Sequence, residues 1–301
     1  MALYINREFK LDEVTLVAVC LQPEHDKAKN LEKYDRFIKD AVAHDADFLA
    51  FPEMSLQGYF WIMENNPEQQ KYYEHEAETI PGPSTDIIQK YCSEYNLYIQ
   101  FGLAEKAEGK MYNTAVLLGP EGIVGSHRKV GCFEPGVSCG TSFSVYKTRI
   151  GKIGLSVCAD FLYPESGRTL ALQGAEVIAN STCSPFIGKD PKTDYRLIRY
   201  DICTKAQALF NQVWYMLANA TGLSSLEKAL GHKGGGIGHS RIINPMGNIV
   251  SEVGYEEGLA IATVDIKRGI YESRSPSGRK FIDFPLHYGI NYIEKLGASP
   301  K

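Results

Sequence analysis

The chain has 301 residues, of which 44% are hydrophobic and 23% are charged, and its formal net charge is −4 at pH 7. This composition is sufficient for a buried core and excludes a disordered chain. No Lys/Arg run marks a nucleic-acid-binding face, and no stretch approaches the roughly 18 consecutive apolar residues of a membrane span. We expect a globular protein that binds neither nucleic acid nor a membrane.

The amino terminus and the cysteines bear on the cellular compartment. The amino-terminal segment has no basic stretch followed by an apolar core, so we expect no secretion signal. The seven cysteines form an odd set without a CxxC pair, in a chain that is neither short nor rich in cysteine. We therefore expect reduced thiols in a cytoplasmic protein. The cysteines lie at positions 20, 92, 132, 139, 158, 183 and 203.

Buried strands and amphipathic helices alternate in the first half of the chain. β-Branched apolar runs predict strands, and apolar residues at helical spacing predict helices. The predicted strands are Val14–Gln22, Phe48–Phe51, Leu97–Ala104, Tyr112–Leu118 and Gly122–His127, and the predicted helices are Asn30–His44 and Ser84–Tyr95.

The second half repeats this alternation. The predicted strands are Gly154–Cys158, Val177–Asn180, Val213–Asn219, Ile237–Ile243, Ile249–Val253 and Leu259–Ile266, and the predicted helices are Glu165–Gly174 and Arg196–Asn211. No linker, low-complexity tract or shift in composition divides the chain. We therefore predict a single α/β domain over residues 1–301, with mixed sheets covered by helices.

Three polar residues stand where predicted strands end, namely Glu53, Lys129 and Cys158. The carboxyl ends of strands in open α/β sheets are where sites form. Taken singly, each residue has an ordinary structural explanation: an exposed carboxylate, a solvated surface cation, and a small buried side chain. A catalytic role can therefore be inferred only because the three residues occur together.

Several segments, in their order along the chain, resemble the nitrilase superfamily of carbon–nitrogen hydrolases. They are VTLVAVCLQP, ADFLAFPEMSLQGY, YNTAVLLGPEGIVGSHRKV, KIGLSVCADFLYPESGRTLALQGAEVI, NQVWYMLAN and GHSRIINPMG. The resemblance covers the chain from about Val14 to Asp265. It implies an αββα sandwich and a catalytic triad of Glu53, Lys129 and Cys158.

The chemistry of amide hydrolysis suits these residue types. The Cys158 thiol would be the nucleophile, and Glu53 would take its proton and later give it to the departing amine. The Lys129 ammonium and the backbone N–H of Ala159 are the expected donors to the oxyanion, each worth about 3–4 kcal/mol in known cases. We expect no cofactor, and no spacing of ligands predicts a metal site.

Other residues are candidates for supporting roles. Family members often carry a second glutamate after the lysine, which orients it or positions substrate; Glu134 is that candidate, with a surface glutamate before a Pro-Gly turn as the alternative. Asp160 is similar to the Cys-x-Asp pattern of amidases and carbamoylases, which favours an amide over a nitrile. Tyr59 and Cys183 fall on loops that would line the pocket or simply pack.

The favoured function is hydrolysis of a small linear amide or N-carbamoyl amine, with water, through a cysteine thioester. Three alternatives remain open: a nitrilase that makes acid and ammonia, an enzyme that passes the acyl group to another acceptor, and a silent family member that acts as a binding protein. The resemblance also implies a homo-oligomer, a dimer or a multiple of one. The tail at about residues 267–301, after a core at about 14–265, is expected in oligomer contacts or packed on its own domain.

Overall fold

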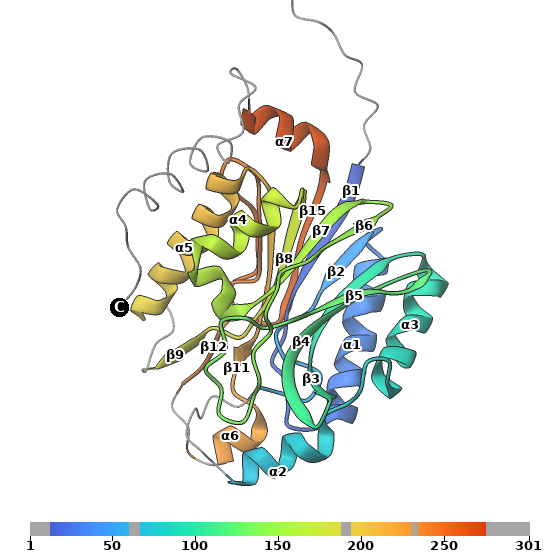
Figure 1. Ribbon diagram of the computed structural model, residues 1–301, viewed down its shortest axis with the longest axis vertical. Coiled ribbons are helices and arrows are strands. Elements are labelled where there is room, and N and C mark those ends of the chain that lie inside the picture. The colour runs from blue at the N-terminus through green and yellow to red at the C-terminus, as the bar shows by residue number, and fades with distance from the viewer. Residues whose placement is uncertain (1–12, 60–66, 188–193, 230, 232–233, 275–301) are drawn as a thin grey trace, which may run out of the picture.

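Two six-stranded mixed sheets face each other, and helices cover the outer face of each (Figure 1). This arrangement is seen in the computed structural model, which describes residues 13–59, 67–187, 194–229, 231 and 234–274. The αββα sandwich predicted from the sequence is therefore confirmed. Within the described part of the chain, no helix has the length and apolar character needed to cross a membrane.

The first sheet contains the first and the last strand of the described chain. In spatial order its strands are β15 (Gly258–Asp265), β1 (Glu13–Cys20), β2 (Phe48–Ala50), β3 (Tyr98–Ala107), β4 (Lys110–Gly119) and β5 (Gly122–Arg128). Strands β1, β2 and β3 are parallel, and the other pairings are antiparallel. Helices α1 (Lys27–Val42) and α3 (Pro83–Tyr95) pack on its outer face.

The second sheet has a similar plan. Its strands in spatial order are β14 (Ile249–Glu252), β13 (Arg241–Ile243), β10 (Trp214–Asn219), β8 (Val177–Thr182), β7 (Gly151–Val157) and β6 (Val145–Thr148). The parallel strands β7, β8 and β10 form its centre. Helices α4 (Pro164–Leu172) and α5 (Tyr195–Asn211) cover its outer face.

Smaller elements complete the described chain. They are α2 (Pro67–Glu76), the 3-10 turn η1 (Cys158–Leu162), β9 (Pro185–Ile187), β11 (Thr221–Gly222), α6 (Ser225–Ala229), β12 (Gly234–Ile237) and α7 (Ile266–Arg274). Strands β9, β11 and β12 form a small third sheet.

The alternation of side chains along β1 shows how the layers are made. Leu16 and Ala18 are fully buried between the two sheets. Val17 and Val19 point the other way and are fully buried beneath the helices of the first sheet. A strand buried on both faces needs an apolar residue at every position, which explains the continuous apolar run in the sequence.

The predicted strand Ile237–Ile243 is wrong as a single element. Strand β12 ends at Ile237 and β13 begins at Arg241. Between them, Gly238 and His239 have φ angles of +67° and +58°, in the left-handed region. Such backbone cannot continue a strand, so the chain leaves the small sheet and enters the second large sheet.

The predicted tail begins with a helix that packs on the chain's own core. In α7, Ile266 and Ile270 are buried in the cluster between the two large sheets. Gly269 lies against the Trp214 ring, where a Cβ atom would approach within 2.6 Å. The start of the tail thus packs at least with one face on its own domain, which was the alternative to oligomer contacts. Oligomer contacts for residues 267–301 stay a prediction, and residues 275–301 lie outside the described chain.

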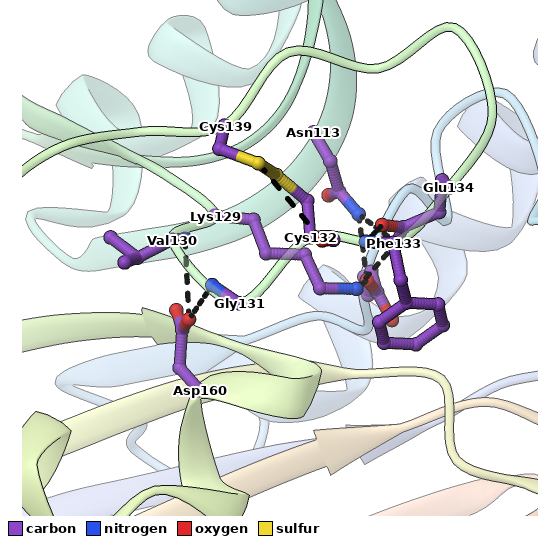
Figure 2. The surroundings of a disulfide bond; sticks show 10 residues. Asn113, Lys129, Val130, Gly131, Cys132, Phe133, Glu134, Cys139 and Asp160 are labelled. Atoms are coloured by element: carbon purple, nitrogen blue, oxygen red, sulfur yellow. Dashed lines mark hydrogen bonds and ion pairs between the residues drawn. A yellow bond between two sulfur atoms is a disulfide. The ribbon is translucent and has the colours of Figure 1, made fainter. Parts of the chain in front are cut away.

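The prediction that all seven cysteines are reduced is also wrong. Cys132 and Cys139 form a disulfide, with their Cα atoms 5.6 Å apart (Figure 2). The loop after Lys129 folds back on itself and brings the two together, which no CxxC spacing in the sequence indicates. The cytoplasmic location, which was inferred in part from reduced cysteines, stays a prediction.

Candidate active site

Strand ends from both large sheets meet at one edge of the sandwich. Strands β2 and β5 run in the same direction, so Glu53 and Lys129, which follow them, lie at the same edge of the first sheet. In the second sheet the parallel strands β7 and β8 lead to Cys158 and Thr182. The Glu53 amide donates a hydrogen bond to the Thr182 carbonyl at 3.3 Å, which joins the two sheets at this edge.

Glu53 and Lys129 form a fully buried ion pair. Nζ of Lys129 lies 2.7 Å from Oε1 of Glu53, and both side chains are 0% exposed. The same Oε1 accepts a second hydrogen bond, at 2.7 Å, from the side-chain amide of Asn113. Oε2 of Glu53 is buried and has no hydrogen-bond partner among the described residues. An unpaired buried carboxylate oxygen is costly, and this one is available to accept a proton.

Glu134 holds Lys129 from the other side. Its Oε1 accepts hydrogen bonds from Lys129 Nζ and, at 3.1 Å, from Asn113 Nδ2, as Figure 2 shows. The alternative of a surface glutamate is therefore wrong, because the side chain is buried against these two donors. The Phe133 ring lies beneath the ammonium, with Nζ 4.8 Å from its centroid.

Cys158 sits at the abrupt end of β7. Its φ angle is +39°, in the left-handed region that residues other than glycine rarely adopt. The residue is 8% exposed. Its thiol interacts with the charges of Glu53 and Lys129, with the Thr182 hydroxyl and with the backbone N–H of Cys183. The structure thus brings the three predicted triad residues together.

The buried surroundings set the protonation states of the site. Burial and the charge of Glu53 raise the pKa of Cys158 to about 12, so the resting side chain is a neutral thiol. Burial also raises the pKa of Glu53 above its ordinary value, against the opposing effect of Lys129. Burial would lower the pKa of Lys129, but the nearby charges of Glu53 and Glu134 raise it, so the ammonium stays protonated. Burial opposes ionisation of Glu134, yet Lys129 lowers its pKa below the ordinary value.

The other predicted residues differ in whether their side chains contact the groups described above. The Tyr59 hydroxyl donates to Glu134 Oε1 at 3.3 Å, and Tyr59 and Cys183 share one buried apolar cluster. Ala159 is buried directly after Cys158, and its N–H donates to no oxygen of the described chain. Asp160 is turned away, because its carboxylate binds His127 and backbone amides.

Sequence reasoning missed two polar groups of the site. Asn113 bridges both glutamates from within β4, and the Thr182 hydroxyl faces the Cys158 thiol from the end of β8. Both stand at buried strand positions, Asn113 beside Thr114 in β4 and Thr182 at the end of the polar run Asn-Ser-Thr in β8. Polar residues that follow apolar runs within a strand were the signal available in the sequence. As for metals, the described residues contain no group of three or more His, Cys, Asp or Glu side chains placed to hold an ion.

Comparisons with known proteins place this geometry in a family. The sequence profile of the family described as carbon–nitrogen hydrolase matches residues 16–270. Omega-amidase NIT2-B of Xenopus laevis is 29% identical over 260 residues, which cover 80% of this chain and 84% of that protein. A nitrilase of Pyrococcus abyssi is 29% identical over 248 residues, which cover 79% and 84%.

A solved structure has the same fold. The carbon–nitrogen hydrolase from Helicobacter pylori G27 superposes with a TM-score of 0.75 at 21% identity, covering 88% of this chain and 92% of that one. At 21% identity this likeness shows the fold alone. The family is shown by the profile match, which covers most of the chain.

Proposed function

The chain belongs to the carbon–nitrogen hydrolase family, and from this premise we propose that it hydrolyses a small linear amide or N-carbamoyl amine through a thioester on Cys158. One observation carries the proposal: Oε2 of Glu53 is a buried oxygen without a hydrogen-bond partner in the described chain, on a carboxylate that interacts with the Cys158 thiol. A neutral thiol beside a free base is the arrangement that nucleophilic catalysis requires.

The first half of the reaction forms the thioester. Glu53 accepts the thiol proton while Sγ of Cys158 attacks the carbonyl carbon of the amide. The oxyanion that forms takes hydrogen bonds from the Lys129 ammonium and from the backbone N–H of Ala159. When the tetrahedral intermediate collapses, the C–N bond breaks and the proton on Glu53 leaves with ammonia or the amine.

The second half uses the same groups with water. Glu53, again ionised, takes a proton from a water molecule whose oxygen attacks the thioester carbonyl. The C–S bond then breaks, the acid leaves, and the proton returns from Glu53 to the sulfur of Cys158. Throughout, Glu134 and Asn113 keep Lys129 in place, since both contact the same cluster of charges.

Amides are proposed as substrates in preference to nitriles. The omega-amidase and the nitrilase are equally similar to this chain, at 29% identity, so identity alone does not separate the two. The preference rests on the similarity of the Cys-x-Asp pattern to that of amidases, not on a contact between Asp160 and the substrate, and on Glu53, which can protonate one departing amine directly. A nitrile needs two protonations and a hydration before ammonia leaves.

The test is ammonia release from matched amides, N-carbamoyl amines and nitriles. Amides or carbamoyl amines should give the higher kcat/KM, and Cys158→Ala should release no ammonia from any of them. A nitrile favoured by tenfold, about 1.4 kcal/mol in barrier height, would replace the amidase assignment by the nitrilase one.

We also propose that the chain is a homo-oligomer whose copies meet through α4 and α5. Seven exposed large apolar residues gather at these helices and their ends: Tyr163, Leu172, Tyr195, Ile198, Ile202, Leu209 and Phe210. A groove of about 300 Å³ between the two helices is lined mostly by apolar side chains, among them Phe161 and Ala206. A second copy would cover this face. Light scattering that gives the mass of one 33.5 kDa chain at micromolar concentration would contradict this proposal.

A further inference from the structure

One buried carboxylate connects the segment that carries Lys129 with the turn that carries Cys158. Asp160 lies in η1, two residues after Cys158, and its side chain is 1% exposed. Its Oδ1 accepts hydrogen bonds from the backbone N–H groups of Val130 at 3.2 Å and Gly131 at 2.8 Å, as Figure 2 shows.

The second oxygen of the same carboxylate has two further partners. Oδ2 accepts a hydrogen bond from the Val157 amide at 2.9 Å and lies 2.9 Å from Nε2 of His127. Because an ionised carboxylate only accepts, Nε2 carries the hydrogen of this pair. The His127 ring is buried and stacks on Phe143, with centroids 5.1 Å apart and an interplanar angle of 21°.

The carboxylate is held in its ionised form by these contacts. Burial alone would raise the pKa of Asp160, but the hydrogen bond from His127 and the amides of Gly131 and Val157 lower it below the ordinary value. Each oxygen has two donors, so all four acceptor positions are used by the protein itself. Asp160 therefore has no oxygen left over for a substrate.

The contacts of Asp160 cross between the two large sheets. His127 belongs to β5 in the first sheet, and Val157 to β7 in the second. Within the described chain, every hydrogen bond between residues 127–131 and residues 157–160 ends on this one carboxylate. It thus fixes the residues on both sides of Lys129 relative to the turn that begins at Cys158.

We propose that Asp160 and His127 are positioning residues, which hold the Lys129 ammonium at the place where the oxyanion on Cys158 forms. This inference rests on the proposed function. A displacement of about 1 Å between reacting groups costs on the order of 100-fold in rate. Loss of the hydrogen bonds to Asp160 should therefore lower turnover more than it weakens substrate binding.

Two substitutions at one position separate positioning from packing. His127→Gln keeps an N–H donor at a reach similar to that of Nε2, whereas His127→Phe keeps an aromatic ring against Phe143 and removes the donor. We expect His127→Phe to lower kcat by roughly tenfold or more with KM within about twofold, and His127→Gln to recover most of the activity. The rate at which iodoacetamide alkylates Cys158 should likewise be highest in the wild type, lower in His127→Gln and lowest in His127→Phe.

Asp160→Asn gives an independent measurement if His127→Phe does not fold. In Asp160→Asn an amide NH₂ group replaces one carboxylate oxygen, and in either orientation it faces two N–H donors. We therefore expect kcat to fall at least as far as in His127→Phe. The matched control is Glu252→Gln. Glu252 also lies 2.9 Å from a histidine, His239, but it belongs to β14, the edge strand of the second sheet opposite to β6. That control should keep wild-type kcat.

The outcomes distinguish this inference from the proposed function. If His127→Phe and Asp160→Asn keep wild-type kcat, or if His127→Gln is as slow as His127→Phe at equal thermal stability, positioning by this pair is refuted while the function stands. If Cys158→Ala turns over amides at the wild-type rate, the proposed function itself fails.

Discussion

Nζ of Lys129 lies 2.7 Å from Oε1 of Glu53 in a site where both side chains are fully buried. Because of this pair, the two oxygens of the Glu53 carboxylate have different surroundings. Oε1 is committed to Lys129 and Asn113, while Oε2 has no hydrogen-bond partner in the described chain and is left to carry a proton. Acid–base chemistry and oxyanion stabilisation are thereby assigned to adjacent groups that stay in contact.

Replacing the proposed base without changing its shape should remove turnover and preserve the fold. In Glu53→Gln an amide stands where the carboxylate was, so it accepts no thiol proton and delivers none to the leaving amine. We expect kcat to fall by about 10²–10⁴-fold, the usual contribution of a positioned acid–base group. Steady-state ammonia release measures the fall, and an unchanged circular dichroism spectrum is the control. Turnover within twofold of wild type would exclude Glu53 as the base.

The lysine should matter for the transition state more than for binding. Lys129→Met removes the side-chain donor to the oxyanion, and removal of one such donor costs about 3–4 kcal/mol in known cases. The substitution should therefore lower kcat by about 10²–10³-fold and change KM little. Kinetics that raise KM alone would show that Lys129 binds substrate rather than the transition state.

The pH dependence of kcat/KM should have a displaced acid limb. Burial raises the pKa of Glu53 above its ordinary value of 4.5, and this group must be ionised to accept the thiol proton. Activity should therefore rise with pH through an apparent pKa above 4.5. Ionisation of Cys158, with a pKa of about 12, should add no break in the neutral range. A pH–rate profile with its acid limb at or below 4.5 would contradict this assignment.

The disulfide should stabilise the loop that presents Glu134. Cys132 and Cys139 close a short loop around this residue, and closing a loop of that length is worth about 2–3 kcal/mol in the chain-entropy model. We expect Cys132→Ser/Cys139→Ser to unfold at lower temperature and to retain reduced activity, because Glu134 still reaches Lys129 but is less restrained. Calorimetry checks the first expectation. A non-reducing peptide map with both thiols free in the wild-type chain would remove the basis for both.

The three triad candidates could be named from the sequence because the ends of strands are recognisable in it and because the resemblance to the nitrilase superfamily singles these residues out; their catalytic roles stay a prediction. Glu53, Lys129 and Cys158 each follow an apolar run, and the parallel strands bring such positions to one edge. His127 and Asn113 escaped notice because each sits within a strand, where the partner that satisfies a polar side chain comes from a distant segment. The disulfide was missed for the same reason, since only the fold of the loop brings Cys132 to Cys139.

The central claim is that the acyl group is carried on Cys158, and mass spectrometry of acid-quenched enzyme during turnover tests it most directly. With a linear amide as substrate, the wild-type chain should gain the mass of one acyl group, and peptide mapping should locate that mass on the peptide containing Cys158. Cys158→Ala should gain no mass and release no ammonia. An acyl group found on any other residue, or amide turnover by Cys158→Ala at the wild-type rate, would contradict the account.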